Sequence, residues 1–381
     1  MELSVDRVQT SRDRREFIEF PKELYRDDSN FVPMFDIDMR TFLNRSHPYF
    51  AHVEVEFLLV RRSDTVVARG MVAKNDAYNR QHDTKCAHFY FVDFVDDDDV
   101  SGALFDAMAE WAVERGLDTL TGPLFCAATT GGGVLIKGHE FLPAMTMMGY
   151  NYPYYQTHYE RVGFRKNFDL NSLHVDPATF QLPERVERLA DRVRDKGRLK
   201  VVRLSSNREM KRLAKDVRAM YNPTLADHRE GYPMTEAELD QVEKELLQIA
   251  HPLLEKVITY EGAVVGYMLG FPDLTPAIQK NRGKLGPIRI LRLLRAKRRP
   301  VRLLLNGMGI LEKYQRLGGN ALIYSEIVKT VKDSGAFSFD DAEMVQINEE
   351  TVLMLSDMIA IGAEVYKIHR VYSRPIGRAA G

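Results

Sequence analysis

A glycine-rich turn between an apolar strand and a helix is the clearest chemical signal in the sequence. The segment Gly307–Ala321 reads GMGILEKYQRLGGNA, and its second part follows the pattern Arg-x-x-Gly-x-Ala. A helix N-terminus carries unpaired backbone N–H groups and a partial positive charge, and glycine lets a phosphate approach that backbone closely. Arg316 adds a full positive charge beside these groups. The segment therefore predicts a pyrophosphate site at the start of the helix.

Other phosphate-binding turns do not fit this segment. A P-loop needs a Gly-Lys-Ser/Thr ending, and a dinucleotide-binding fold needs a G-x-G-x-x-G run near the start of its domain. Neither pattern is present here. The plain alternative is a turn without a ligand, because glycine pairs before helices are common features of turns and helix ends.

The turn resembles the R/Q-x-x-G-x-G/A loop of the GNAT superfamily of N-acyltransferases. In that family the loop follows the fourth strand and opens the third helix, and a strand and a helix with an early asparagine come next. Here Asp341–Val345 leads to Asn348 at the start of a helix. The resemblance implies coenzyme A, as acyl-CoA, for a co-substrate and no metal ion. It places the coenzyme on the following residues: Met308, Gly309, Ile310, Leu311, Arg316, Leu317, Gly318, Gly319, Asn320, Ala321 and Asn348.

Two longer runs carry a closer resemblance. The run GHEFLPAMTMMGYNYPYYQTHYERVGFRKNFDL and the tail NEETVLMLSDMIAIGAEVYKIHRVYSR are similar to a two-domain bacterial GNAT family that includes proteins assigned as bacterial ceramide synthases. This resemblance implies transfer of an acyl group from a thioester to an amine, with a long-chain acyl group and a lipid amine preferred. A small-molecule N-acetyltransferase is the first alternative. A non-catalytic binding or regulatory protein with the same fold is the second.

Direct attack of a free amine on a thioester, the reaction of this family, needs a general base. Glu312 is the first candidate, because GNAT enzymes often carry a glutamate just past the fourth strand; the alternative is a solvated turn residue. His228, in TLADHREGYPMT, is the second, although a lone histidine is more often structural. Many family members have a tyrosine seven residues after the helix asparagine, but Leu355 stands there. Ser356 and Tyr366 are weaker substitutes, so protonation of the leaving thiolate has no assigned residue.

The elements that must position these residues repeat along the chain. A length of 381 residues favours two domains, which we place at 1–180 and 181–381. Apolar periodicity and turn signals predict the order β-α-(α)-β-β-β-α-β-(α)-β in each half. In the second half, strand Val301–Ile310 and helix Asn320–Ser334 flank the turn, and in the first half a strand at Tyr159–Lys166 closes the order. We expect an α/β fold of tandem GNAT-like domains, each a mixed, mostly antiparallel twisted sheet flanked by helices.

The first half carries Asp96–Asp99 where the phosphate-binding turn would lie. These carboxylates would repel a pyrophosphate, and they suit the first turn of the helix that follows. A calcium site is the alternative, although the spacing of an EF-hand is missing. We therefore expect a degenerate half that serves as structure or shapes the acceptor pocket.

A long loop rich in Gly, Met and Tyr, Pro123–Tyr155, is the candidate wall of that acceptor pocket. Long irregular segments inside a domain usually serve function. An apolar core between the two halves is the alternative. Together with a residue from the loop after His228, the candidate substrate-binding residues are His139, Glu140, Tyr154, Tyr155 and Tyr232.

A basic insertion at 284–300 separates the third and fourth strands of the second half. Drawn as a helix, it has a basic face with Arg289, Arg292, Arg295 and Arg299, and an opposite face with Ile290, Leu291, Leu293 and Leu294. Such a helix suits an anionic membrane surface or the groove of a partner protein. The alternative is a helix packed on its own domain with a solvated charged face.

The composition limits the remaining functions. The net charge of −1 argues against a nucleic-acid partner. The two cysteines, Cys86 and Cys126, cannot build a disulfide framework or a four-ligand zinc site. The N-terminus has no apolar signal region, and no apolar run approaches the about 20 residues that span a bilayer. We expect a cytoplasmic protein, with contact to the inner face of the membrane through 284–300.

Overall fold

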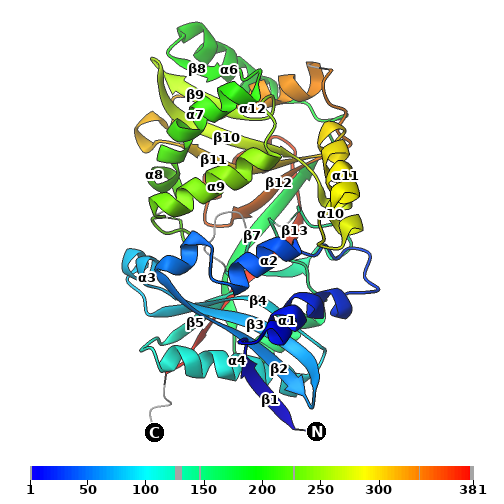
Figure 1. The fold of residues 1–381 in the computed structure, drawn as a ribbon. Coiled ribbons are helices and arrows are strands. Elements are labelled where there is room, and N and C mark those ends of the chain that lie inside the picture. The colour runs from blue at the N-terminus through cyan, green and yellow to red at the C-terminus, as the bar shows by residue number, and fades with distance from the viewer. Residues whose placement is uncertain (1, 125–130, 146, 226–227, 334, 378–381) are drawn as a thin grey trace.

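One twisted sheet runs through both halves of the chain in the computed structural model, which describes residues 2–124, 131–145, 147–225, 228–333 and 335–377 (Figure 1). Within these residues the sheet has 13 strands in the order β1-β2-β3-β4-β5-β13-β7-β12-β11-β10-β9-β8, and β6 pairs with β13. Most neighbouring strands are antiparallel, and helices flank the sheet. The expected fold class is therefore confirmed. Cys126 lies outside the described residues, and Cys86 is buried.

The strands divide between the halves in chain order. The first half supplies β1 (Leu3–Arg7), β2 (Val53–Arg62), β3 (Thr65–Asn75), β4 (Cys86–Phe94), β5 (Thr119–Gly122), β6 (Val134–Lys137) and β7 (Arg165–Val175). The second half supplies β8 (Leu199–Val202), β9 (Lys256–Tyr260), β10 (Ala263–Pro272), β11 (Arg302–Ile310), β12 (Asp341–Asn348) and β13 (Glu364–Pro375).

The helices follow the same division. The first half has α1 (Ser11–Leu24), α2 (Asp36–Leu43), the short 3-10 helix η1 (Pro48–Ala51), α3 (Asp76–His82), α4 (Asp98–Val113) and α5 (Tyr154–Arg161). The second half has α6 (Glu184–Lys196), α7 (Asn207–Ala219), α8 (Tyr221–Leu225), α9 (Glu236–Ile249), α10 (Thr275–Asn281), α11 (Pro287–Arg298), η2 (Glu312–Tyr314), α12 (Gly319–Asp333) and α13 (Val352–Ala360).

One predicted element is wrong. The segment expected to form a strand at Tyr159–Lys166 begins inside helix α5, and the strand that follows, β7, starts only at Arg165. The aromatic residues there suggested a strand, but Tyr155 and Tyr159 stand four residues apart, so a helix places both on one face. Both are almost fully buried against α4. Packing of this face against α4 therefore favours a helix, although the residues themselves have a local preference for a strand.

The last strand of each half pairs with strands of the other half. Strand β7 pairs antiparallel with β12, from Val175 opposite Ala342 to Leu170 opposite Asn348. Strand β13 pairs antiparallel with β5, and β7 and β13 pair with each other in the middle of the sheet. The exchange joins the halves into one sheet through central strands. The division of the chain at residue 180 stays a prediction.

The strands β11 and β12 start as a parallel pair and then separate. They are paired only where Arg302–Leu305 faces Asp341–Met344. Directly beyond, Gly307 has φ +100° and Gln346 has φ +50°, and both strands shift register against their outer neighbours. The ends of β11 and β12 therefore form no ladder with each other, and a space opens between them.

A buried charge network lies where the two strands separate. The carboxylate of Glu343 on β12 is fully buried and lies 3.2 Å from Arg302 Nη1 and 3.2 Å from Lys367 Nζ. Arg302 also pairs with Asp273, the residue after β10, over 2.9 Å. Burial lowers the pKa of Lys367 to about 8 despite the nearby carboxylate. The network therefore connects β10, β11, β12 and β13 at one level of the sheet.

We expect Glu343→Ala to lower the free energy of unfolding by about 3–5 kcal/mol, because it leaves Arg302 and Lys367 buried without their shared counter-charge. Urea unfolding measures the change. Glu261→Ala is the matched control, because that carboxylate pairs with Arg198 at the surface and its loss costs less than about 1 kcal/mol. Equal losses in the two variants would mean that the network does not stabilise the separated strands.

Candidate functional site

The turn between β11 and α12 needs its two glycines for steric reasons. Gly318 has φ +86°, and a Cβ there would lie 2.6 Å from Val193 on α6. A Cβ on Gly319 would lie 2.9 Å from the side chain of Ile310. Larger residues would therefore push the first turn of α12 away from β11 and from α6.

The start of α12 is open to an anion. The N–H groups of Gly319, Asn320 and Ala321, in the first turn, have no acceptor within their own helix. Arg316 is exposed beside them, and among the described residues no carboxylate lies within ion-pair distance of its guanidinium. This combination of open N–H groups and an uncompensated charge is what a phosphate group requires.

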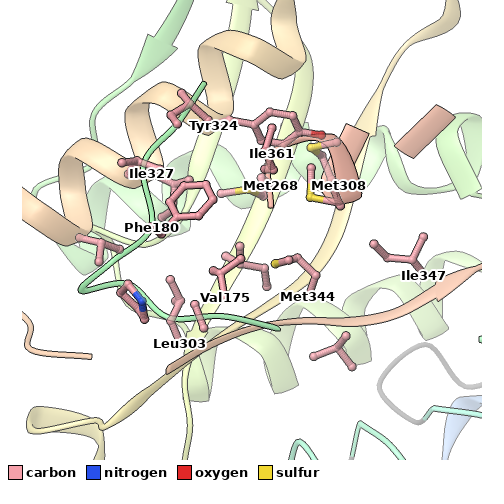
Figure 2. A pocket seen from close by; sticks show the side chains of 18 of the residues that line it. Val175, Phe180, Met268, Leu303, Met308, Tyr324, Ile327, Met344, Ile347 and Ile361 are labelled. Atoms are coloured by element: carbon pink, nitrogen blue, oxygen red, sulfur yellow. The ribbon is translucent and has the colours of Figure 1, made fainter. Parts of the chain in front are cut away.

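An apolar cavity of about 110 Å³ lies under α12 and α13, on one face of β11 and β12. Figure 2 shows Met268, Met308 and Met344 from three neighbouring strands, with Ile327 of α12 on the other side of the space. Its remaining walls include Val175, Phe180, Leu303, Ile347, Met354, Met358 and Ile361. The cavity has the lining expected for a hydrocarbon chain.

One polar group in the apolar cavity has no partner among the residues that the structure describes. Tyr324 of α12 lines the cavity, and its buried hydroxyl forms no hydrogen bond among the described residues. Burial raises the pKa of Tyr324 well above its ordinary value, so the hydroxyl keeps its proton. It is a hydrogen-bond donor available to a ligand.

A polar pocket of about 220 Å³ lies against the same separated strands. It is lined by His228, Glu230 and Tyr232 from the loop between α8 and α9, and by Gln346 and Asn348 from β12. The polar pocket and the apolar cavity share wall residues from the strand ends and from α13. These shared residues are Gly307, Met308, Val345, Ile347 and Met354. The two spaces therefore meet where β11 and β12 separate.

A histidine, a glutamate and an asparagine lie close together in the wall of this pocket. His228 Nδ1 lies 3.7 Å from Glu230 Oε1, and Asn348 Nδ2 donates a 2.6 Å hydrogen bond to Glu230 Oε2. Burial raises the pKa of Glu230, but the nearby imidazole of His228 and the hydrogen bond from Asn348 outweigh it and hold the pKa below its ordinary value. The carboxylate therefore stays charged near neutral pH and orients the imidazole.

The structure brings together only part of the predicted site. Met308 lines both spaces, and the turn residues around Arg316 lie together at the start of α12. Asn348 lies in the polar pocket, where its amide binds Glu230. His228 and Tyr232 line the same pocket.

Glu312, by contrast, lies away from both spaces. It is exposed in η2 and lines neither the apolar cavity nor the polar pocket. Two residues that the sequence analysis missed, Glu230 and Tyr324, do line these spaces. Glu230 could have been noticed as a carboxylate two residues after His228, but no sequence signal marks Tyr324.

The first-half candidates lie elsewhere. The hydroxyl of Tyr155 accepts a 3.0 Å hydrogen bond from the N–H of Phe94, and the hydroxyl of Tyr154 donates a 2.6 Å bond to the Phe94 carbonyl. His139 is half-buried and Glu140 is exposed. None of the four lines the apolar cavity or the polar pocket.

The first half is closed where the second half is open. Helix α4 is the counterpart of α12, and Asp97 caps it by accepting from the N–H groups of Asp99 and Val100. Asp97 also pairs with Arg62 over 2.7 Å. The expectation of an acidic helix start is confirmed, and these carboxylates take the place that an anion would need.

Among the residues that the structure describes, no three His, Cys, Asp or Glu side chains lie close enough together to hold a metal ion. Among the described helices, none is both long and apolar enough to cross a lipid bilayer.

No family model matches the chain, but two curated bacterial proteins do. Protein YghO of Escherichia coli K12 is 27% identical over 375 residues, covering 96% of this chain and 93% of that protein. Bacterial ceramide synthase of Caulobacter vibrioides is 27% identical over 384 residues, covering 98% of each. Among solved structures, a tandem GNAT protein from the clavulanic acid biosynthesis pathway covers 99% of this chain and 100% of its own, with a TM-score of 0.57 and 13% identity.

These comparisons agree with the geometry of the second half. The chain has the tandem GNAT fold. Its particular resemblance, to bacterial proteins among which one is named a ceramide synthase, is also confirmed, over nearly the full length of both chains.

The open start of α12 predicts binding of inorganic pyrophosphate. We expect pyrophosphate to raise the melting temperature of the native protein, because a ligand that binds only the folded state stabilises it. Arg316→Glu should remove the shift, since it reverses the charge beside the N–H groups. Arg188→Glu, a charge reversal at an exposed position of α6, is the control and should keep the shift. Loss of the shift in both variants would point to a general charge effect.

Proposed function

We propose that the protein is an acyl-CoA-dependent N-acyltransferase that transfers a long-chain acyl group from a thioester to a lipid amine. One observation carries the proposal: an apolar cavity and a polar pocket meet at the separated strands β11 and β12, next to a helix start that is open to phosphate. The apolar cavity suits an acyl chain, the polar pocket suits the reacting amine, and the helix start suits a pyrophosphate.

Coenzyme A fits the residues around the turn. The N–H groups at the start of α12 and the charge of Arg316 suit its pyrophosphate. The end of β11, from Met308 onward, has backbone groups that β12 does not pair, and these suit the thioester. A backbone N–H there would stabilise the oxyanion that forms on the thioester carbonyl.

The polar pocket supplies the acid–base chemistry. The amine nitrogen attacks the thioester carbon, the new C–N bond forms, and the C–S bond breaks to release the thiolate of coenzyme A. We assign His228 as the base that takes the proton from the amine, with Glu230 as the positioning residue. The Tyr324 hydroxyl, unpartnered in the cavity wall, is our candidate donor to the thiolate, in place of the family tyrosine that is Leu355 here.

The lipid part of the proposal rests on two supports. The apolar cavity is lined almost entirely by aliphatic and aromatic side chains, as a long acyl chain requires. One curated relative is named bacterial ceramide synthase. We place the protein in the cytoplasm, with segment 284–300 in contact with the inner face of the membrane.

Two alternative functions predict different binding and turnover of acyl-CoA. A small-molecule N-acetyltransferase would bind acetyl-CoA as well as a long-chain acyl-CoA and would leave the apolar cavity unused. A non-catalytic binding protein would bind acyl-CoA without turnover, and the leucine at position 355 is the feature that favours it.

The apolar cavity predicts a dependence on acyl-chain length. We expect palmitoyl-CoA to stabilise the protein against heat more than acetyl-CoA or coenzyme A at equal concentration, with at least about tenfold tighter binding. Ile327→Trp should remove this preference, because the indole fills the cavity, and should leave coenzyme A binding unchanged. Val113→Trp, at an exposed position of α4, is the control. Equal affinity for acetyl-CoA and palmitoyl-CoA would support the small-molecule alternative.

The polar pocket predicts that His228 and Glu230, and not Glu312, determine the rate of acyl transfer. We expect His228→Ala to lower kcat by about 10²–10⁴-fold and Glu230→Gln by a smaller factor, with KM for acyl-CoA unchanged. Because the pKa of Glu230 lies below its ordinary value, the Glu230→Gln loss should be constant from about pH 6 to about pH 9. Steady-state rates with a long-chain amine measure both. If Glu312→Gln lost the rate instead, the base would be Glu312 and this assignment would be wrong.

A further inference from the structure

Helix α11 presents large apolar side chains to solvent. Ile288, Leu291, Leu294 and Ile290 are 76%, 66%, 51% and 47% exposed, and Leu285 just before the helix is 43% exposed. In Figure 1 the helix lies along one side of the second half. The alternative of a helix packed on its own domain by this apolar face does not fit Ile290, Leu291 and Leu294, which face outward. We call these five residues the α11 ridge.

The opposite face of α11 is well anchored. Arg292 Nη1 donates a 2.6 Å hydrogen bond to Asn281 Oδ1, and Lys297 Nζ donates a 2.8 Å bond to the carbonyl of Gln248. Leu293 and Ala296 pack on a buried cluster that includes Ile278. The outward direction of the ridge is therefore fixed by specific contacts on the inner face.

Basic residues accompany the ridge on the exposed side. Arg295 and Arg298 are exposed on the same arc of the helix as Leu291 and Leu294. The whole stretch from residue 280 to residue 300 has no acidic residue. Its basic residues are Lys280, Arg282, Lys284, Arg289, Arg292, Arg295, Lys297, Arg298 and Arg299. Apolar side chains flanked by cations match a bilayer with anionic headgroups better than they match water.

We infer that the α11 ridge is the membrane-docking surface of this protein and that its partner is an anionic lipid bilayer. The helix lies in the plane of the interface, with Ile288, Leu291 and Leu294 among the acyl chains and with Arg295 and Arg298 at the headgroups. The inference specifies the proposed membrane contact and rests on it, but it does not depend on acyl transfer. Because α11 leads directly into β11, docking holds the half with the two cavities at the bilayer.

Co-sedimentation of the full chain with lipid vesicles tests the inference. We expect binding to vesicles that contain phosphatidylglycerol and at least tenfold weaker binding to pure phosphatidylcholine vesicles. Ile288→Ser/Leu291→Ser should lower the partition coefficient on anionic vesicles at least tenfold. Arg295→Gln/Arg298→Gln should reduce the preference for the anionic lipid.

A single-site comparison separates docking from general stickiness. Leu291→Ser and Ile37→Ser each remove one aliphatic side chain that is more than half exposed, on α11 and on α2 respectively. Only the α11 change should weaken binding, and melting temperatures show that both variants fold. Equal effects of the two changes, equal binding to both kinds of vesicle, or no binding to vesicles would each overturn the inference. Since no turnover is measured, such a failure would leave the proposed acyl transfer untouched.

Discussion

The separation of β11 and β12 is the constraint on which the rest of the second half depends. Backbone groups at the end of a strand need partners, and these two strands lose theirs after Leu305 and Met344. The chain compensates at the point of separation with the buried pairs of Glu343 and with the long ladder between β12 and β7. Because β12 is held on its other side, it can part from β11 without fraying, and both cavities reach the opening.

The first half has the same arrangement of a short parallel strand pair and a following helix, but side chains of the protein fill the space at the strand ends. Its parallel pair, β4 and β5, is also short, but Tyr154 and Tyr155 of α5 bind the backbone of Phe94 at the end of β4. Asp97 likewise satisfies the first N–H groups of α4. In the first half, side chains of the protein thus occupy the strand end and the helix start that are open in the second half. The two halves have similar elements and differ mainly in whether these positions are filled.

The sequence predicts what local patterns determine and misses what distant contacts determine. The strand, turn and helix around Arg316 are found within a residue or two of the expected bounds, because glycine spacing and apolar periodicity are local. The exchange of β7 and β13 has no such signal. The alternation of side chains shows which face of a strand is buried, but it does not show which strand is the neighbour. Glu312 is the first candidate in the sequence because the family resemblance places a glutamate just past the fourth strand. The fold adds that the α8–α9 loop with His228 lines the polar pocket, whereas Glu312 does not.

The exchanged strands also bring residues of both halves into the walls of the two spaces. The apolar cavity takes Val175 from β7 of the first half, and the polar pocket takes Leu170 from the same strand. In return Tyr232 and Met234, next to His228, are buried in a cluster with Phe17 and Tyr49 of the first half. The first half therefore helps to build both spaces, because it supplies one wall and fixes the loop that carries His228. Its loss would remove the pocket together with the support for His228.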